Sequence, residues 1–123
     1  MRLLLDTHYL VWAALGEPMP AKAKALIMDP ANELFISAVS PWEMALKAGK
    51  APIDAAVLLE HAKAAGYTIL PIEAEHTLEV ARLPTYHSDP FDRLLLAQAM
   101  LESLTLLTHD HQLARYGHPV LHI

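Results

Sequence analysis

Five short runs of mostly apolar residues, separated by segments with helical character, constrain the fold of this chain more than any other sequence feature. The runs are Arg2–Leu5, Glu33–Ser37, Thr68–Ile72, Leu104–Thr108 and Pro119–Ile123. Their apolar residues are consecutive rather than alternating, which is typical of strands buried on both faces. Such strands, alternating with helices, indicate a parallel sheet with helices packed against it. The sequence therefore predicts an α/β fold.

The segments between these runs carry residues that begin and end helices. We expect helices at Thr7–Leu15, Ala21–Met28, Ser40–Ala48, Ala55–Ala65, Ala74–Arg82, Asp89–Glu102 and Asp110–Tyr116. Two of them begin with a capping residue, a proline and an acid, in Ser40-Pro41-Trp42-Glu43 and Asp89-Pro90-Phe91-Asp92. In this interpretation Ser40 is an N-cap, and Glu43 can complete a capping box with it.

The length of 123 residues favours a single domain over residues 1–123. The longest run without Asp, Glu, Lys or Arg is Thr7–Gly16, which is far shorter than the ~20 residues of a membrane-spanning helix. The chain has no cysteine, which excludes disulfides, thiolate catalysis and sulfur-ligated metals. A cytoplasmic protein without membrane contact is therefore expected.

Four acidic residues lie near strand ends or helix starts, although the pattern does not fix the side of the sheet on which Asp92 falls. In parallel sheets ligands bind beyond the carboxyl ends of the strands, near the point where the strand order reverses. Asp6 directly follows the first apolar run, and Asp110 follows the fourth by two positions. Glu43 and Asp92 lie in the first turns of expected helices, where the helix dipole favours a negative charge. If the first and fourth strands are neighbours, Asp6 and Asp110 approach each other.

Several carboxylates in one cleft repel one another, and a divalent cation relieves this repulsion. Oxygen ligands of this kind suit Mg²⁺ or Mn²⁺, so the pattern predicts a metal site. Each acid also has a structural alternative. Glu43 can belong to a capping box, Asp92 can favour a helix start, and Asp110 can cap the last helix. Asp89 is interpreted as an N-cap outside the site.

Four motifs occur in the same order as in a known family. They are Leu4-Leu5-Asp6-Thr7-His8, Ser40-Pro41-Trp42-Glu43, Asp89-Pro90-Phe91-Asp92-Arg93-Leu94-Leu95-Leu96-Ala97-Gln98-Ala99 and Leu106-Leu107-Thr108-His109-Asp110. With them the chain resembles PIN-domain proteins, in particular the VapC-type toxins of bacterial toxin–antitoxin pairs. The resemblance covers nearly the whole chain, and its most specific part is the segment Asp89–Leu95. It implies a three-layer α/β/α sandwich around a five-stranded parallel sheet.

The resemblance also implies an activity. Asp6, Glu43, Asp92 and Asp110 match the four acidic positions of the family, as metal ligands and catalytic residues. The implied protein is a Mg²⁺- or Mn²⁺-dependent endoribonuclease toxin that hydrolyses RNA phosphodiesters with metal-activated water. Its implied partners are a cognate antitoxin and a second copy of the chain, with DNA reached only through the antitoxin. The alternative is a non-catalytic PIN-like module that binds protein or RNA, which the presence of all four acids disfavours.

The net charge of −5 alone argues against a simple nucleic-acid-binding module, whose surface should be basic. Without the four proposed ligands, however, the rest of the chain is close to neutral. An RNA partner would then be held through metal ions more than through a basic surface.

Several residues near the acids keep two interpretations. Arg93 contacts a phosphate or pairs with an acid, and Lys47 and Lys50 extend an RNA path or are solvated at a helix end. Thr7 and Thr108 are expected to orient carboxylates or water. The histidines next to the acids are interpreted as loop residues rather than ligands; they are His8, His87, His109 and His111.

The two tryptophans, Trp12 and Trp42, are interpreted as core or dimer-contact residues rather than as platforms for RNA bases. The apolar stripe of the first expected helix, Thr7–Leu15, and the alanine-rich helices are the expected dimer surface.

Overall fold

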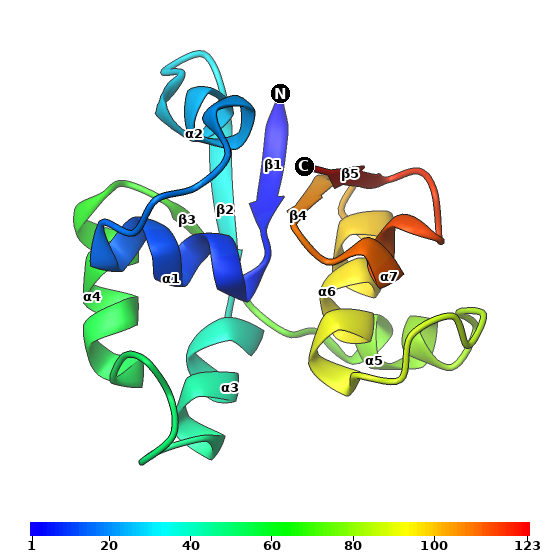
Figure 1. The fold of residues 1–123 in the computed structure, drawn as a ribbon. Coiled ribbons are helices and arrows are strands. Elements are labelled where there is room, and N and C mark those ends of the chain that lie inside the picture. Colours follow the sequence, from blue (N-terminus) through cyan, green and yellow to red (C-terminus); the bar gives the residue numbers. More distant parts are fainter.

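The computed structural model describes residues 1–123 as a parallel sheet with helices on both sides (Figure 1). The strands are β1 (Arg2–Leu5), β2 (Glu33–Ser37), β3 (Thr68–Leu70), β4 (Thr105–Thr108) and β5 (Val120–His122). The helices are α1 (Thr7–Leu15), α2 (Ala21–Met28), α3 (Val39–Leu46), α4 (Ala55–Ala64), α5 (Ala74–Val80), α6 (Pro90–Leu101) and α7 (His111–Ala114). Every element expected from the sequence is present. None of these helices has the length and apolar character needed to cross a membrane.

The sheet has five parallel strands in the order β3-β2-β1-β4-β5. The central strand β1 pairs on one side with β2 and on the other with β4, where Leu4 lies opposite Phe35 and Leu106. The chain adds strands first on the β2 side and later on the β4 side, so the order reverses between β1 and β4. The expected adjacency of the first and fourth strands is therefore confirmed.

Successive residues of the central strands pack into different cores. Leu4 and Leu106 belong to a core that includes buried residues of α6 and Leu113 of α7. Their neighbours Leu5 and Leu107 pack on the other face, against α1 and α2. Figure 1 shows α1, α2 and α4 on one side of the sheet and α5, α6 and α7 on the other. The three-layer α/β/α sandwich expected from the family resemblance is thus confirmed.

The start of α3 differs from the expectation. The helix begins at Val39, and its N-cap is Ala38, which makes no side-chain hydrogen bond. The prediction of a capping box formed by Ser40 and Glu43 was therefore wrong. The reason is that Ser37, at the end of β2, supplies the acceptor: its Oγ lies 2.9 Å from the Val39 nitrogen. Ser40 is buried inside the first turn, with its Oγ 2.9 Å from Oγ1 of Thr7.

The start of α6 agrees with the expectation. Asp89 is the N-cap, and its Oδ1 accepts hydrogen bonds from the nitrogens of Phe91 (2.8 Å) and Asp92 (3.2 Å). Pro90 occupies the first helical position, where a missing N–H costs nothing. The cap therefore places Asp92 in the first turn of α6.

The expected dimer surface on α1 is largely used by the core. Leu10 and Val11 are buried in a cluster with residues of β2, α3 and α4. Leu15, at the end of the helix, stays 44% exposed. Only the last turn of α1 therefore presents a large apolar side chain to solvent.

A buried glutamine ties α6 to the carboxyl end of the sheet. Gln98 is fully buried, and its Oε1 accepts a hydrogen bond of 2.5 Å from Oγ of Ser37. Its Nε2 donates to the carbonyl oxygen of Pro71, just after β3, over 3.1 Å. Because α6 also carries Asp92, this network helps to set the position of that acid relative to the strands.

Replacing Gln98 by alanine is expected to lower the free energy of unfolding by about 1–3 kcal/mol, because the Ser37 hydroxyl and the Pro71 carbonyl lose their partner. Urea denaturation followed by circular dichroism measures the change. Gln112→Ala is the matched control, since Gln112 is exposed and its substitution should change stability by less than about 0.5 kcal/mol. Equal effects of the two substitutions would contradict the structural role of Gln98.

Candidate active site

Three of the four expected acids meet at the carboxyl edge of β1 and β4. Asp6 follows β1 and is only 2% exposed. Its Oδ2 accepts a hydrogen bond of 2.5 Å from Oγ1 of Thr108, the last residue of β4. The same threonine oxygen accepts a hydrogen bond of 3.0 Å from the nitrogen of Asp110. One hydroxyl group therefore links the two acids, and Thr108 orients a carboxylate as expected.

Asp92 and Asp110 are brought together by a histidine. Nε2 of His87 lies 2.9 Å from Oδ2 of Asp92 and 2.9 Å from Oδ2 of Asp110. Potential ligand atoms of these three residues all lie within 4.8 Å of one another, a spacing that can hold a metal ion. The sequence places Asp92 and Asp110 on different helices, and the fold makes them neighbours.

Glu43 lies outside this group. Its side chain is buried on α3, and its Oε2 is 2.6 Å from Nζ of Lys47, one turn along the helix. The hydrogen bond to Glu43 raises the pKa of Lys47, and the charges of Asp89 and Asp92 raise it further. Lys47 is thus an exposed residue at the end of α3, as expected, and it also forms an ion pair with Glu43.

Burial and mutual repulsion make some of these acids resist ionisation. Burial raises the pKa of Asp6, although the hydrogen bond from Thr108 opposes the shift. Burial, followed by the charges of Asp89 and Asp6, raises the pKa of Asp92 to about 7. Asp110 differs: burial alone would raise its pKa, but hydrogen bonds from the Gln112 nitrogen and from His87 lower it.

A hard divalent cation fits this donor set. The available donors are carboxylate oxygens, which Mg²⁺ and Mn²⁺ prefer. Burial raises the pKa of Asp92, and the charges of Asp89 and Asp6 raise it further, so a cation beside Asp92 would favour its ionised form. Both observations agree with the metal site expected from the sequence.

The histidines next to the acids have different surroundings. His8 and His111 are exposed residues in the first turns of α1 and α7, so the loop interpretation was wrong for them. His109 does lie in a loop and packs its ring against Trp12, with Nδ1 2.8 Å from the carbonyl oxygen of Ile123. His87 instead contacts two acids directly. The sequence shows only that His87 lies five residues before Asp92. This spacing does not predict that the loop brings the His87 ring against both Asp92 and Asp110.

Two further expectations need correction. Arg93 neither points to a phosphate site nor pairs with an acid, because its guanidinium donates to carbonyl oxygens of Val80, Pro84 and His87. Thr7 bonds Ser40 rather than a carboxylate. The cause is the same at both positions: nearby backbone or hydroxyl groups satisfy the side chain before an acid does.

The two tryptophans have different surroundings. Trp12 is partly buried and packs its ring against Tyr9 and His109. Trp42 is 47% exposed, and its ring lies 5.0 Å from that of Phe91. Trp12 thus supports the core, as expected, whereas Trp42 remains accessible at the surface of α3.

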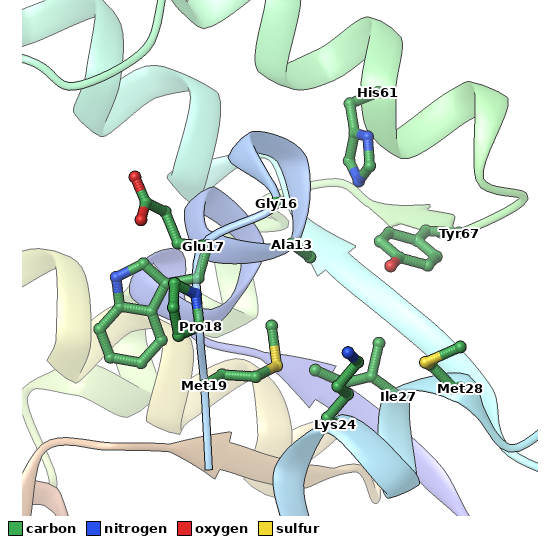
Figure 2. Close-up of a pocket in the computed structure, with 11 residues that line it drawn as sticks. Ala13, Gly16, Glu17, Pro18, Met19, Lys24, Ile27, Met28, His61 and Tyr67 are labelled. Carbon is green, nitrogen blue, oxygen red and sulfur yellow. The ribbon is translucent and has the colours of Figure 1, made fainter. Parts of the chain in front are cut away.

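A large pocket lies away from the acids. It has a volume of about 590 Å³ and is lined by residues of α1, α2 and α4 and of the segments that follow α1 and α4. Figure 2 shows His61 and Tyr67 on one side of this pocket and Met19, Lys24 and Ile27 on the other. Because none of the four expected acids lines it, pocket size does not locate the candidate site here.

A smaller pocket, of about 360 Å³, adjoins Glu43. Its polar lining includes Thr7, His8 and Glu43, together with Lys47 and Lys50. Both lysines that the sequence suggested for an RNA path thus line a hollow that begins at a candidate acid.

Replacing Asp92 by asparagine is expected to stabilise the metal-free protein at pH 8 and to have less effect at pH 5. A carboxyl whose pKa is raised from 3.8 to about 7 on folding contributes stability below pH 3.8, and this contribution is lost as the pH rises through about 7. The asparagine variant avoids that loss, so its free energy of unfolding should exceed that of the wild type by on the order of 1 kcal/mol at pH 8.

Urea denaturation in EDTA at the two pH values measures this difference. Asp29→Asn is the matched control, because Asp29 is an exposed aspartate whose Oδ1 contacts only the Ala31 nitrogen. A difference between Asp92→Asn and wild type that does not grow with pH would contradict the raised pKa of Asp92.

Comparison with known proteins gives a consistent result. The model of the PIN domain family matches residues 3–119. The chain is 30% identical to Ribonuclease VapC22 of Mycobacterium tuberculosis over 125 aligned positions, which cover 95% of this chain and 93% of that protein.

Solved structures share the fold at lower identity. VapBC2 from Rickettsia felis, bound to a promoter DNA fragment, has a TM-score of 0.74 at 19% identity, covering 100% of this chain and 98% of that chain. A toxin–antitoxin complex from Klebsiella pneumoniae has a TM-score of 0.67 at 21% identity, covering 97% and 95%. VapC20 of Mycobacterium tuberculosis, described as a toxin that cleaves the sarcin–ricin loop, has a TM-score of 0.61 at 15% identity, covering 94% and 95%. The matched family model, the relative at 30% identity and the shared fold together show that this chain belongs to the PIN-domain family and is of the VapC type.

Proposed function

We propose that this chain, as one PIN domain over residues 1–123, is a metal-dependent endoribonuclease and the toxin of a toxin–antitoxin pair. The observation that carries the proposal is that His87 joins Asp92 and Asp110, and that Thr108 links the Asp6 carboxylate to the Asp110 nitrogen, at the strand-order reversal between β1 and β4. The relative at 30% identity is named a ribonuclease, which supports the same reaction class.

The acids would hold Mg²⁺ or Mn²⁺. Asp6, Asp92 and Asp110 would contribute carboxylate oxygens from the β1–β4 edge, and Glu43 would contribute from α3. When bound, the cation would make a coordinated water more acidic and neutralise charge on the phosphate. The chain itself orients the acids, through the Thr108 hydroxyl and through the N-terminal turn of α6.

Lys47 and Lys50 support an RNA path next to these acids. Both line the pocket beside Glu43, where ammonium groups can contact phosphate oxygens of a bound strand. Lys47 also neutralises Glu43, with 2.6 Å between Nζ and Oε2. The RNA would thus be held by Lys47 and Lys50, at the end of α3 and just after it, and its phosphodiester bond would be cut next to the acids.

The proposed partners follow from the same features. A cognate antitoxin is supported by the toxin–antitoxin complexes that share this fold, and its Arg or Lys side chains would suit the acidic cleft. DNA would be reached only through that antitoxin. A second copy of the chain as a partner and the cytoplasm as the place of action complete the proposal.

The central test is cleavage of RNA by the purified chain. Wild type is expected to cut RNA in millimolar Mg²⁺ or Mn²⁺ and to lose activity in EDTA. Asp6→Asn and Asp92→Asn should each lower the rate by roughly 100-fold or more, because each removes a charged ligand. Gel analysis of end-labelled RNA fragments measures the rates.

Glu60→Gln is the matched control, since Glu60 is an exposed acid on α4, and it should cleave like wild type. If wild type binds the metal and leaves a broad set of RNAs intact, the non-catalytic alternative replaces the enzyme. If the two aspartate variants cleave as fast as the control, the site assignment is wrong.

Metal binding is also expected to stabilise the fold, because the unfolded chain has no clustered acids. At a Mn²⁺ concentration one hundred times the dissociation constant, the expected gain is about 2.7 kcal/mol in free energy of unfolding. Thermal melting in Mn²⁺ and in EDTA measures it, and Glu60→Gln should show the same gain. A melting temperature that is unchanged by Mn²⁺ would contradict a metal site at the acids.

A further inference from the structure

The loop between α5 and α6, residues 81–89, is held by Arg93 and Tyr116 and also by Arg115, whose Nη1 lies 3.4 Å from the Tyr86 oxygen. From α6, Arg93 Nη1 lies 3.0 Å from the Pro84 oxygen and 3.2 Å from the His87 oxygen, and its Nη2 lies 3.0 Å from the Val80 oxygen. From the segment after α7, the Tyr116 hydroxyl donates to the Pro84 oxygen over 2.6 Å and accepts from the His87 nitrogen over 3.1 Å. The backbone of His87 is therefore fixed at both its N–H and its C=O.

The side chain of His87 is fixed as well. Its Nδ1 lies 3.3 Å from the backbone nitrogen of Asp89, which can only donate, so Nδ1 acts as the acceptor. The ring hydrogen of the neutral imidazole is then on Nε2, which faces carboxylate oxygens of Asp92 and Asp110 at 2.9 Å each. In this arrangement Nε2 is a hydrogen-bond donor, and a nitrogen that carries a hydrogen cannot ligate a metal ion.

This donor acts on two groups that otherwise repel each other. One N–H shared by the two carboxylates keeps their oxygens close to each other. Each oxygen keeps a further lone pair for another partner, so the contact leaves room for a cation on the opposite side of the pair. Hydrogen bonds to ligating carboxylates are the kind of contact whose loss weakens metal binding.

We propose that His87 is a positioning residue that holds Asp92 and Asp110 at the separation needed by a divalent cation, and that Arg93 acts through His87 by fixing its loop. The proposal rests on the proposed function, since it concerns the same acids. It also assigns Arg93 a role away from RNA, because its guanidinium already donates to four backbone carbonyl groups.

The test is the affinity of the full chain for Mn²⁺, measured by isothermal titration calorimetry without RNA. His87→Ala should raise the dissociation constant by roughly 10- to 100-fold, the range typical for loss of a contact to a metal ligand. His87→Gln should keep it within a few-fold of wild type, because the glutamine amide can donate from about the same place. His111→Ala, which removes an exposed imidazole next to Asp110, should change it by less than about threefold.

Arg93→Gln is expected to weaken Mn²⁺ binding in wild type but not in the His87→Ala background. Such non-additivity is the signature of two residues that act through one contact. Tyr116→Phe removes the two loop hydrogen bonds and keeps the ring, so it should give the same pattern if Arg93→Gln does not fold. Additive losses, or an Arg93→Gln variant that raises only KM for RNA with Mn²⁺ affinity unchanged, would overturn the role of Arg93.

The outcomes separate this proposal from the proposed function. If wild type binds no Mn²⁺, the metal-dependent function is overturned and the role of His87 falls with it. If wild type binds Mn²⁺ and His87→Ala binds equally well or more tightly, the proposed function stands. His87 would then be a bystander or a competitor of the cation, and the positioning role would be overturned.

Discussion

The pairing of β1 with β4 is the interaction on which the acidic site depends. The residues Leu3–Leu5 are fully buried, and the ladder continues beyond them through a hydrogen bond of 3.0 Å from the Asp6 nitrogen to the Leu107 oxygen. Asp6 therefore leaves the sheet at the level where β4 ends. The Asp6 carboxylate is buried as well, because the packing that covers Leu3–Leu5 also covers the residue that follows them. A strand buried this deeply thus places a charge where solvent cannot satisfy it.

The position of these acids lowers the stability of the fold, while it provides the carboxylates that the proposed reaction needs. Burial and repulsion raise the pKa of Asp92 to about 7. In the folded chain without a cation, Asp92 therefore stays protonated at pH values at which an aspartate in water is ionised. The cost is tolerated because large cores on both faces of the sheet fix the surrounding elements. Sites that bind charged ligands commonly conflict with local stability in this way.

Much of the fold could be predicted from the sequence because its signals are local. Apolar runs mark the strands, and Asp89-Pro90 marks the start of α6. Asp6 and Asp110 could be placed on one edge because parallel strands end there, whereas Asp92 needed the family resemblance. What could not be predicted depends on contacts between distant segments. His87 is held by Tyr116, 29 positions away, and no local pattern encodes that hydrogen bond.

Asp6 is both the N-cap of α1 and a candidate ligand, so one side chain serves the helix and the proposed site. Its Oδ1 accepts from the Tyr9 nitrogen over 2.9 Å, and its Oδ2 accepts from Thr108 over 2.5 Å. The cap and the threonine together fix the orientation of this carboxylate. An asparagine at this position would keep a side-chain oxygen that can cap α1 and would lose the charge. The helix-capping role and the charged role of Asp6 are therefore separable by a single substitution.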